Sequence, residues 1–208
     1  STDESYNLLT KISSKESRIT LLRNNTNSGY PSSLNKAISQ SKGDFIAIFD
    51  DDDENQKDRI SLQIQRIIEF ENKNNKPLIL CYSNRNVFKT GESVYDHVAY
   101  AIGRKEPEPF GEEVAEYIFG LPVEEKKTWG MFGSCTLMAR KKLFEIVGKF
   151  DESFRRSAEL DYAIRAAFKG TYFIAVNKSL ISMHKTKSLD KAGRIPLKYS
   201  LKLRQKYI

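Results

Sequence analysis

Residues 45–53 restrict the fold of this chain more than any other stretch. Five apolar residues at 45–49 come directly before four consecutive aspartates at 50–53. A short apolar run without helical spacing predicts a buried strand, so the acids lie at the C-terminal end of that strand. In open α/β sheets this end faces the ligand crevice. The stretch therefore predicts an α/β fold with carboxylates at its binding site.

The four carboxylates have two interpretations. Adjacent like charges repel one another and do not enter a core unpaired, so they are either solvated or hold a cation. Oxygen ligands suit a hard ion, and we expect Mn²⁺ or Mg²⁺. In the simpler interpretation the run is an exposed turn, in which Asp53 caps the next helix. The apolar strand directly before the acids favours the cation.

Strand and helix signals alternate along the rest of the chain. Apolar runs predict strands at 18–23, 77–82, 134–140, 172–176 and 179–183, with a hairpin arm at 83–91. Helices are predicted at 32–41, 55–71, 112–119 and 141–147, from 157 to the stop at Gly170, and after a cap at 1–4. In the helix at 55–71 the expected apolar stripe is Ile60, Ile64, Ile67 and Ile68. This order predicts a mostly parallel sheet flanked by helices.

Composition leaves the partner open. The chain has 208 residues, of which 39% are hydrophobic, and this is enough for one globular domain. A formal net charge of +7 fits an anionic ligand or an acidic membrane surface as well as nucleic acid. Cys81 and Cys135 are too few and too widely spaced to suggest a metal site, and we expect reduced thiols in a cytoplasmic protein.

Two series of short motifs follow one another along the chain. The first is Asn27-x-Gly29, Asn35-Lys36-Ala37, Lys42-Gly43-Asp44-Phe45 and Phe49-Asp50-Asp51-Asp52-Asp53. The second is Gly148-Lys149-Phe150-Asp151-Glu152, Ala158-Glu159-Leu160-Asp161, Arg165, Gly170 and His184. Together they resemble family 2 glycosyltransferases of the GT-A fold. The resemblance implies a GT-A-like domain at 1–184, with a donor-side half at 1–83 and an acceptor-side half at 84–184, before a basic tail at 185–208.

The same resemblance implies an N-terminally truncated domain. Ser1-Thr2-Asp3 matches the end of an Asp-Asp-Gly-Ser-x-Asp segment of the family, so the first strand, first helix and second strand are expected to be absent. Their absence would leave an edge of the sheet uncovered. We therefore expect self-association through that edge.

The resemblance implies an inverting, metal-dependent glycosyltransferase. Its expected donor is a nucleotide-diphosphate sugar, in particular a UDP-sugar, and its acceptor a glycan or a lipid-linked molecule rather than nucleic acid. The expected metal ligands are Asp50, Asp52 and His184. The residues expected at the donor are Gly29, Asn35, Asp50 and Asp51.

Glu159 and Asp161 are the expected catalytic residues. In the family the acid two positions before the one aligned with Asp161 is the general base, and here it is Glu159. Glutamate can make the same proton transfer with a longer reach. The alternatives are an acid in the first helical turn for Glu159 and an i,i+4 ion pair with Arg165 for Asp161. For His184 the alternative is a structural histidine.

Residues 185–208 and the function of the chain each have an alternative interpretation. Residues 185–208 hold eight basic residues and one acid, Asp190, and form either an exposed helix or a peripheral anchor to anionic lipid. A haloacid dehalogenase-type phosphatase also places Asp-x-Asp after a strand, although Glu54 stands where it needs Thr or Val. A non-catalytic nucleotide- or glycan-binding module is the other alternative.

Overall fold

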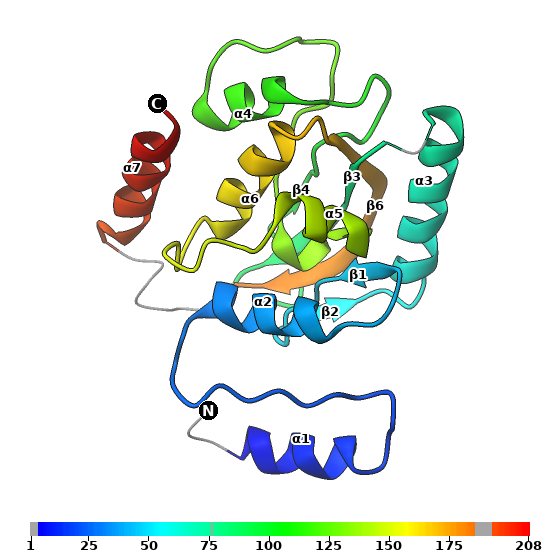
Figure 1. Ribbon diagram of the computed structural model, residues 1–208, viewed down its shortest axis with the longest axis vertical. Coiled ribbons are helices and arrows are strands. Elements are labelled where there is room, and N and C mark those ends of the chain that lie inside the picture. The colour runs from blue at the N-terminus through cyan, green and yellow to red at the C-terminus, as the bar shows by residue number, and fades with distance from the viewer. Residues whose placement is uncertain (1–3, 76, 186–192) are drawn as a thin grey trace.

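The computed structural model describes residues 4–75, 77–185 and 193–208, and helices surround one central sheet (Figure 1). The strands are β1 (Phe45–Ala47), β2 (Asp53–Asn55), β3 (Ile79–Phe88), β4 (His97–Ala99), β5 (Met138–Arg140) and β6 (Tyr172–His184). The helices are α1 (Ser5–Ser13), α2 (Tyr30–Gln40), α3 (Arg59–Lys73), α4 (Glu112–Phe119), α5 (Lys141–Val147), α6 (Ala158–Ala167) and α7 (Ile195–Tyr207). A short 3₁₀ turn, η1 (Ser134–Thr136), precedes β5.

The sheet has the order β1-β5-β3-β6-β2, and β4 pairs with β3 outside this path. The strands β1, β3 and β6 share one direction, because β3 and β6 pair in parallel and β5 is antiparallel to both β1 and β3. These are the strands expected at 45–49, 77–82 and 172–176. The sheet is nevertheless mixed, since β5 lies between β1 and β3 and β2 joins β6 in antiparallel pairing.

Two of the strands are longer than the sequence predicts. The strand expected at 77–82 and the hairpin arm at 83–91 form one strand, β3, and the two expected at 172–176 and 179–183 form β6. Register shifts at Ser83, Asn84 and Arg85 mark the irregularity that separates the halves. The β3 and β6 ladder thus continues past this bulge as far as the acidic loop.

Helix α3 turns a different face to the sheet from the one expected. Ile67 is buried, but Ile60 and Ile68 are 39% and 41% exposed. Arg59 and Gln63 occupy the buried positions instead, and the Gln63 amide donates to the carbonyl oxygens of Cys81 and Thr136 at 3.2 and 2.8 Å. The predicted stripe is confirmed at Ile64 and Ile67 and wrong at Ile60 and Ile68, because buried polar residues satisfied by main-chain groups look like surface residues in a sequence.

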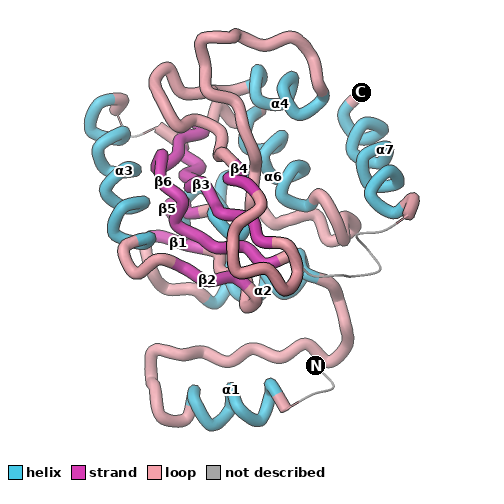
Figure 2. The backbone as a smooth tube through the Cα atoms, turned by 180° about the vertical axis from the view of Figure 1, so that it is seen from behind, coloured by secondary structure: helices cyan, strands magenta, loops and turns pink. Residues whose placement is uncertain are grey.

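The N-terminal segment lies apart from the sheet (Figures 1 and 2). α1 forms where a short helix is expected, yet none of its own residues is buried. The strand expected at 18–23 was wrong, because these residues pair with no strand in the described part of the chain. The cap expected at 1–4 lies, at positions 1–3, outside the described residues.

Candidate active site

A buried arginine shapes the loop between β1 and β2 that carries the four aspartates. Arg59, at the start of α3, is 1% exposed and donates to the Ile48 carbonyl oxygen at 2.9 Å and to Asn55 Oδ1 at 2.5 Å. Its guanidinium also lies 4.3 Å from the centre of the Phe49 ring. Burial lowers the pKa of Arg59 to about 10, so the side chain is still charged at neutral pH. One cation therefore joins the two ends of the acidic loop.

Asp50 and Asp53 come together with Cys135 of η1. One ligand atom from each residue lies within 4.8 Å of the other two. Burial, together with the charges of Asp53, Asp52 and Asp51, raises the pKa of Asp50 to about 6. Burial also raises the pKa of the Cys135 thiol, to about 11, so this group is neutral. Two neighbouring carboxylates thus share a partly dehydrated site.

Asp53 has an oxygen that no hydrogen bond satisfies. Its Oδ2 is buried, and within the described residues it has no hydrogen-bond partner. Burial is the main cause that raises the pKa of Asp53, and Arg85 and the backbone of His184 act in the opposite sense. An ionised buried oxygen without a donor is costly, and a bound cation would remove that cost. The two carboxylates suit a hard divalent ion, whereas the neutral Cys135 thiol does not.

The other expected metal ligands, Asp52 and His184, and the expected donor residue Asp51 lie outside this cluster. Asp51 and Asp52 are exposed at the tip of the loop. His184 ends β6 next to Met183, which pairs with Asp53 across the sheet. Its ring stacks on Phe88 with the centroids 4.9 Å apart. Its Nε2 is buried and has no hydrogen bond in the part of the chain described, but it lies 3.6 Å from Glu54 Oε1, within ion-pair distance.

Arg85 of β3 is a site residue that the sequence did not indicate. Its Nη1 donates to Cys135 Sγ at 3.4 Å. Its positive charge lowers the pKa values of Asp50, Asp53 and Glu159, against the larger effect of burial. A side chain at Gly133 would place its Cβ 2.2 Å from Nη1, so it would displace the guanidinium of Arg85 from this position. A single arginine in a strand carries no sequence signal for such a role.

Tyr30 lies close enough to Asp50 and Glu159 for their charges to act on its hydroxyl. Tyr30 begins α2, and its hydroxyl is hydrogen-bonded to Ser134. Burial raises the pKa of Tyr30, and the charges of Asp50 and Glu159 add to this. Glu159 lies in the first turn of α6. Burial raises its pKa also, which makes it a stronger base than an ordinary glutamate.

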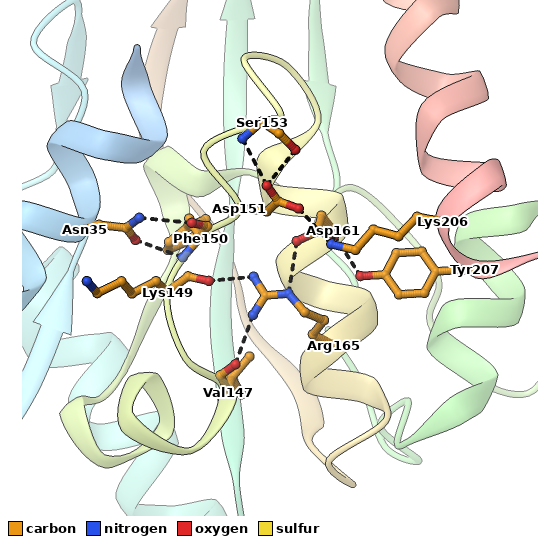
Figure 3. A network of polar contacts seen from close by, with 10 residues as sticks. All are labelled: Asn35, Val147, Lys149, Phe150, Asp151, Ser153, Asp161, Arg165, Lys206 and Tyr207. Carbon is orange, nitrogen blue, oxygen red and sulfur yellow. Dashed lines mark hydrogen bonds and ion pairs between the residues drawn. The ribbon is translucent and has the colours of Figure 1, made fainter. Parts of the chain in front are cut away.

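Asp161 is held in a network of ion pairs (Figure 3). Its side chain is fully buried, and Oδ2 accepts from Arg165 Nε at 3.0 Å. Its Oδ1 accepts from Lys206 Nζ at 2.6 Å and from the Tyr207 hydroxyl at 2.7 Å. The i,i+4 ion pair with Arg165 is present as the helical geometry suggested. Both oxygens are occupied, which favours a positioning role for Asp161.

Two residues expected at the donor are Asn35, on α2, and Gly29, just before this helix. The Asn35 amide donates to the Phe150 carbonyl oxygen at 2.9 Å and to Glu152 Oε1 at 3.0 Å, and Asn35 Oδ1 accepts from the Phe150 N–H at 2.8 Å (Figure 3). Gly29 precedes α2 with a φ of 83°, a value that favours glycine. Asn35 therefore links α2 to the turn before α6.

The raised pKa of Asp50 predicts a measurable effect on stability. Asp50→Asn should increase the free energy of unfolding by about 1 kcal/mol at about pH 7.5 in EDTA, after allowance for solvent screening, because the native state disfavours the charge. The gain should disappear below about pH 4, where the aspartate is protonated in both states. Urea unfolding at both pH values measures it. A variant that is less stable than wild type at about pH 7.5 would contradict the explanation.

Comparisons with known proteins agree with this architecture. The model of the family described as glycosyl transferase family 2 matches residues 1–146. Among curated proteins, the chain is 26% identical over 168 residues to the amylovoran biosynthesis glycosyltransferase AmsB of Erwinia amylovora, which covers 80% of this chain and 50% of that protein. The chain thus spans half the length of this relative.

Solved structures of TarS from S. aureus share the fold. Full TarS superposes with a TM-score of 0.57 at 18% identity, over 88% of this chain and 29% of that chain. TarS 1–349 in complex with UDP-GlcNAc gives a TM-score of 0.59 at 15% identity, over 90% and 48%. These similarities confirm the predicted α/β fold of the GT-A type.

Proposed function

Because the chain belongs to glycosyltransferase family 2, we propose that it transfers a sugar from a nucleotide-diphosphate donor to a glycan or lipid-linked acceptor. The observation that supports this most directly is the paired Asp50 and Asp53, with the buried, unsatisfied oxygen of Asp53. A pair of acids with an unsatisfied oxygen suits a cation that arrives with a diphosphate. The phosphatase alternative has no comparable support.

The ion that fits these residues is Mn²⁺ or Mg²⁺. Asp50 and Asp53 would hold it, with Asp52 and His184 as the further ligands that the sequence suggests. When bound, it neutralises the charge that develops on the departing diphosphate. Arg85 adds a fixed positive charge from the protein beside the same acids.

Glu159 is the proposed general base. It would accept the proton of the acceptor hydroxyl as that oxygen attacks the anomeric carbon, and burial, which raises its pKa, makes it a stronger base for this step. Attack from the face opposite the leaving group gives inversion. Asp161, with both oxygens bonded, would fix the first turn of α6, which also carries Glu159.

The names of the relatives suggest the substrate class. AmsB is named for amylovoran biosynthesis, and a TarS structure contains UDP-GlcNAc. We propose a UDP-sugar as donor, a cell-surface polysaccharide or its lipid-linked precursor as acceptor, and the cytoplasm as the location. Self-association through the free edge of β1 remains a proposal that sedimentation velocity would test.

Calorimetric titration with UDP tests the donor site. Wild-type protein should bind UDP in Mn²⁺ and lose at least about tenfold in affinity in EDTA. Asp50→Asn should abolish the difference between Mn²⁺ and EDTA. Asp44→Asn, which changes an exposed acid on the other side of β1, is the matched control and should behave as wild type.

Two results would contradict the proposal. One is UDP affinity in Asp50→Asn that still depends on Mn²⁺. The other is a wild-type protein that does not bind UDP with either ion. Slow hydrolysis of the sugar nucleotide in the absence of acceptor would separate an enzyme from a non-catalytic binding module.

A further inference from the structure

Helix α7 has two faces with different surroundings. On its inner face Leu203 is buried in the main core, and the Tyr207 ring contacts those of Phe119 and Phe168. On its outer face Leu197, Leu201 and Ile208 are 57%, 51% and 82% exposed. Positions 197, 201 and 208 lie on one side of a helix. An apolar row thus faces away from the protein.

The inner face is fixed by ion pairs and hydrogen bonds rather than by apolar packing alone. Lys206 contacts Asp161 and also Asp151, at 2.8 Å (Figure 3). Lys202 donates to the Ser153 carbonyl oxygen at 2.8 Å. The helix is therefore held in one orientation, and its outer apolar row is not free to turn inward.

The outer face is also basic. Residues 193–208 contain five basic residues, Arg194, Lys198, Lys202, Arg204 and Lys206, and no acid. Lys202 and Lys206 contact the inner face, and Arg204 donates to the Phe119 carbonyl oxygen at 3.3 Å, so Arg194 and Lys198 are the exposed cations beside the apolar row.

We propose that this outer face of α7, made of Leu197, Leu201 and Ile208 with Arg194 and Lys198 as flanking cations, binds an anionic lipid surface. Apolar side chains flanked by cations without an acid are what an interfacial helix requires. A second copy of the chain fits less well, because it would bring the same cations against one another. No helix within the described residues is long and apolar enough to cross a membrane, so this contact would be peripheral.

Such a contact would also orient the site. The Asp161 network joins α7 to α6, and Glu159 lies in the first turn of α6. If the acceptor is lipid-linked, an assumption that rests on the proposed function, α7 would hold Glu159 at a fixed distance from the lipid surface. The binding of lipid itself does not depend on the proposed activity and is tested separately.

Sedimentation with vesicles tests the inference on the full chain. Wild-type protein should sediment with phosphatidylcholine vesicles that contain about 30% phosphatidylglycerol and stay in solution with phosphatidylcholine alone. The double variant Leu197→Gln/Leu201→Gln should bind at least about tenfold more weakly. The matched control is Ile60→Gln/Ile68→Gln, which changes two isoleucines of similar exposure on α3, on the opposite flank of the sheet (Figure 1), and should bind as wild type.

Three results would overturn the inference. The first is a wild-type protein that does not sediment with the anionic vesicles. The second is an equal loss of binding in the α3 control. The third is a lipid-free dimer that Leu197→Gln/Leu201→Gln dissociates, because the outer face would then be an interface between copies. Circular dichroism and unchanged UDP binding establish that the variants are folded.

Discussion

Replacing Glu159 by glutamine should reduce sugar transfer by about 10²- to 10⁴-fold and leave UDP affinity within about twofold of wild type. Glutamine keeps the shape of the side chain but cannot accept the proton of the acceptor hydroxyl. The loss should appear in kcat, because the base acts on the acceptor and not on the donor. Initial rates of transfer to an acceptor glycan, measured beside UDP binding, give both quantities.

Asp161→Asn is the matched variant for this experiment. Asp161 has both carboxylate oxygens bonded to Arg165, Lys206 and Tyr207, so its replacement should affect transfer mainly through stability. If Asp161→Asn abolishes transfer in folded protein while Glu159→Gln is active, the base has been assigned to the wrong carboxylate. Glu159→Asp keeps the carboxylate on a shorter side chain. If the carboxylate is required, this variant should transfer sugar faster than Glu159→Gln and more slowly than wild type.

Replacing Asp161 by alanine should lower the free energy of unfolding by about 3 kcal/mol. The variant removes the partner that Arg165 and Lys206 share, while Lys206 keeps Asp151 and Arg165 keeps two carbonyl oxygens. Urea unfolding at about pH 7.5, followed by circular dichroism, measures the loss. Asp58→Asn is the control, because Asp58 forms an exposed pair with Lys178 and its loss should change stability little.

A milder variant covers the case in which Asp161→Ala does not fold. Tyr207→Phe removes one hydrogen bond to Asp161 and should lower the free energy of unfolding by about 1 kcal/mol. It should also make residues 193–208 more sensitive to protease while the rest of the chain stays resistant. Full stability in both Tyr207→Phe and Lys206→Met would show that the network does not hold α7.

The sequence predicted those parts of the fold that depend on local patterns. The apolar runs before Asp50 and around Ile174 form strands that share a direction, and the helix predicted at 112–119 is α4, with the same bounds. The buried face of α3 was not predicted, because Arg59 and Gln63 take positions that hydrophobic spacing assigns to isoleucine. A partner for 18–23 could not be judged at all from local sequence, since pairing is a long-range property.

The candidate site was predictable only where its residues are adjacent in sequence. The four aspartates attract attention as a run, and the resemblance added Glu159 and His184. Arg85 and Tyr30 come from β3 and α2, and only the fold places them beside Asp50. The sequence also did not predict that Asp53 joins Asp50 in the site, because the position of Asp53 depends on the pairing of β2 with β6.

The anchoring of the acidic loop has a consequence for protein engineering. Arg59 donates to a main-chain oxygen of Ile48 and to Asn55 and Gln63, and these bonds leave the aspartate side chains free. The backbone conformation at 49–54 is therefore stabilised by contacts that do not involve the aspartate side chains at 50–53. Other ligand sets, such as histidines for a softer ion, could be grafted at 50–53 onto an unchanged frame.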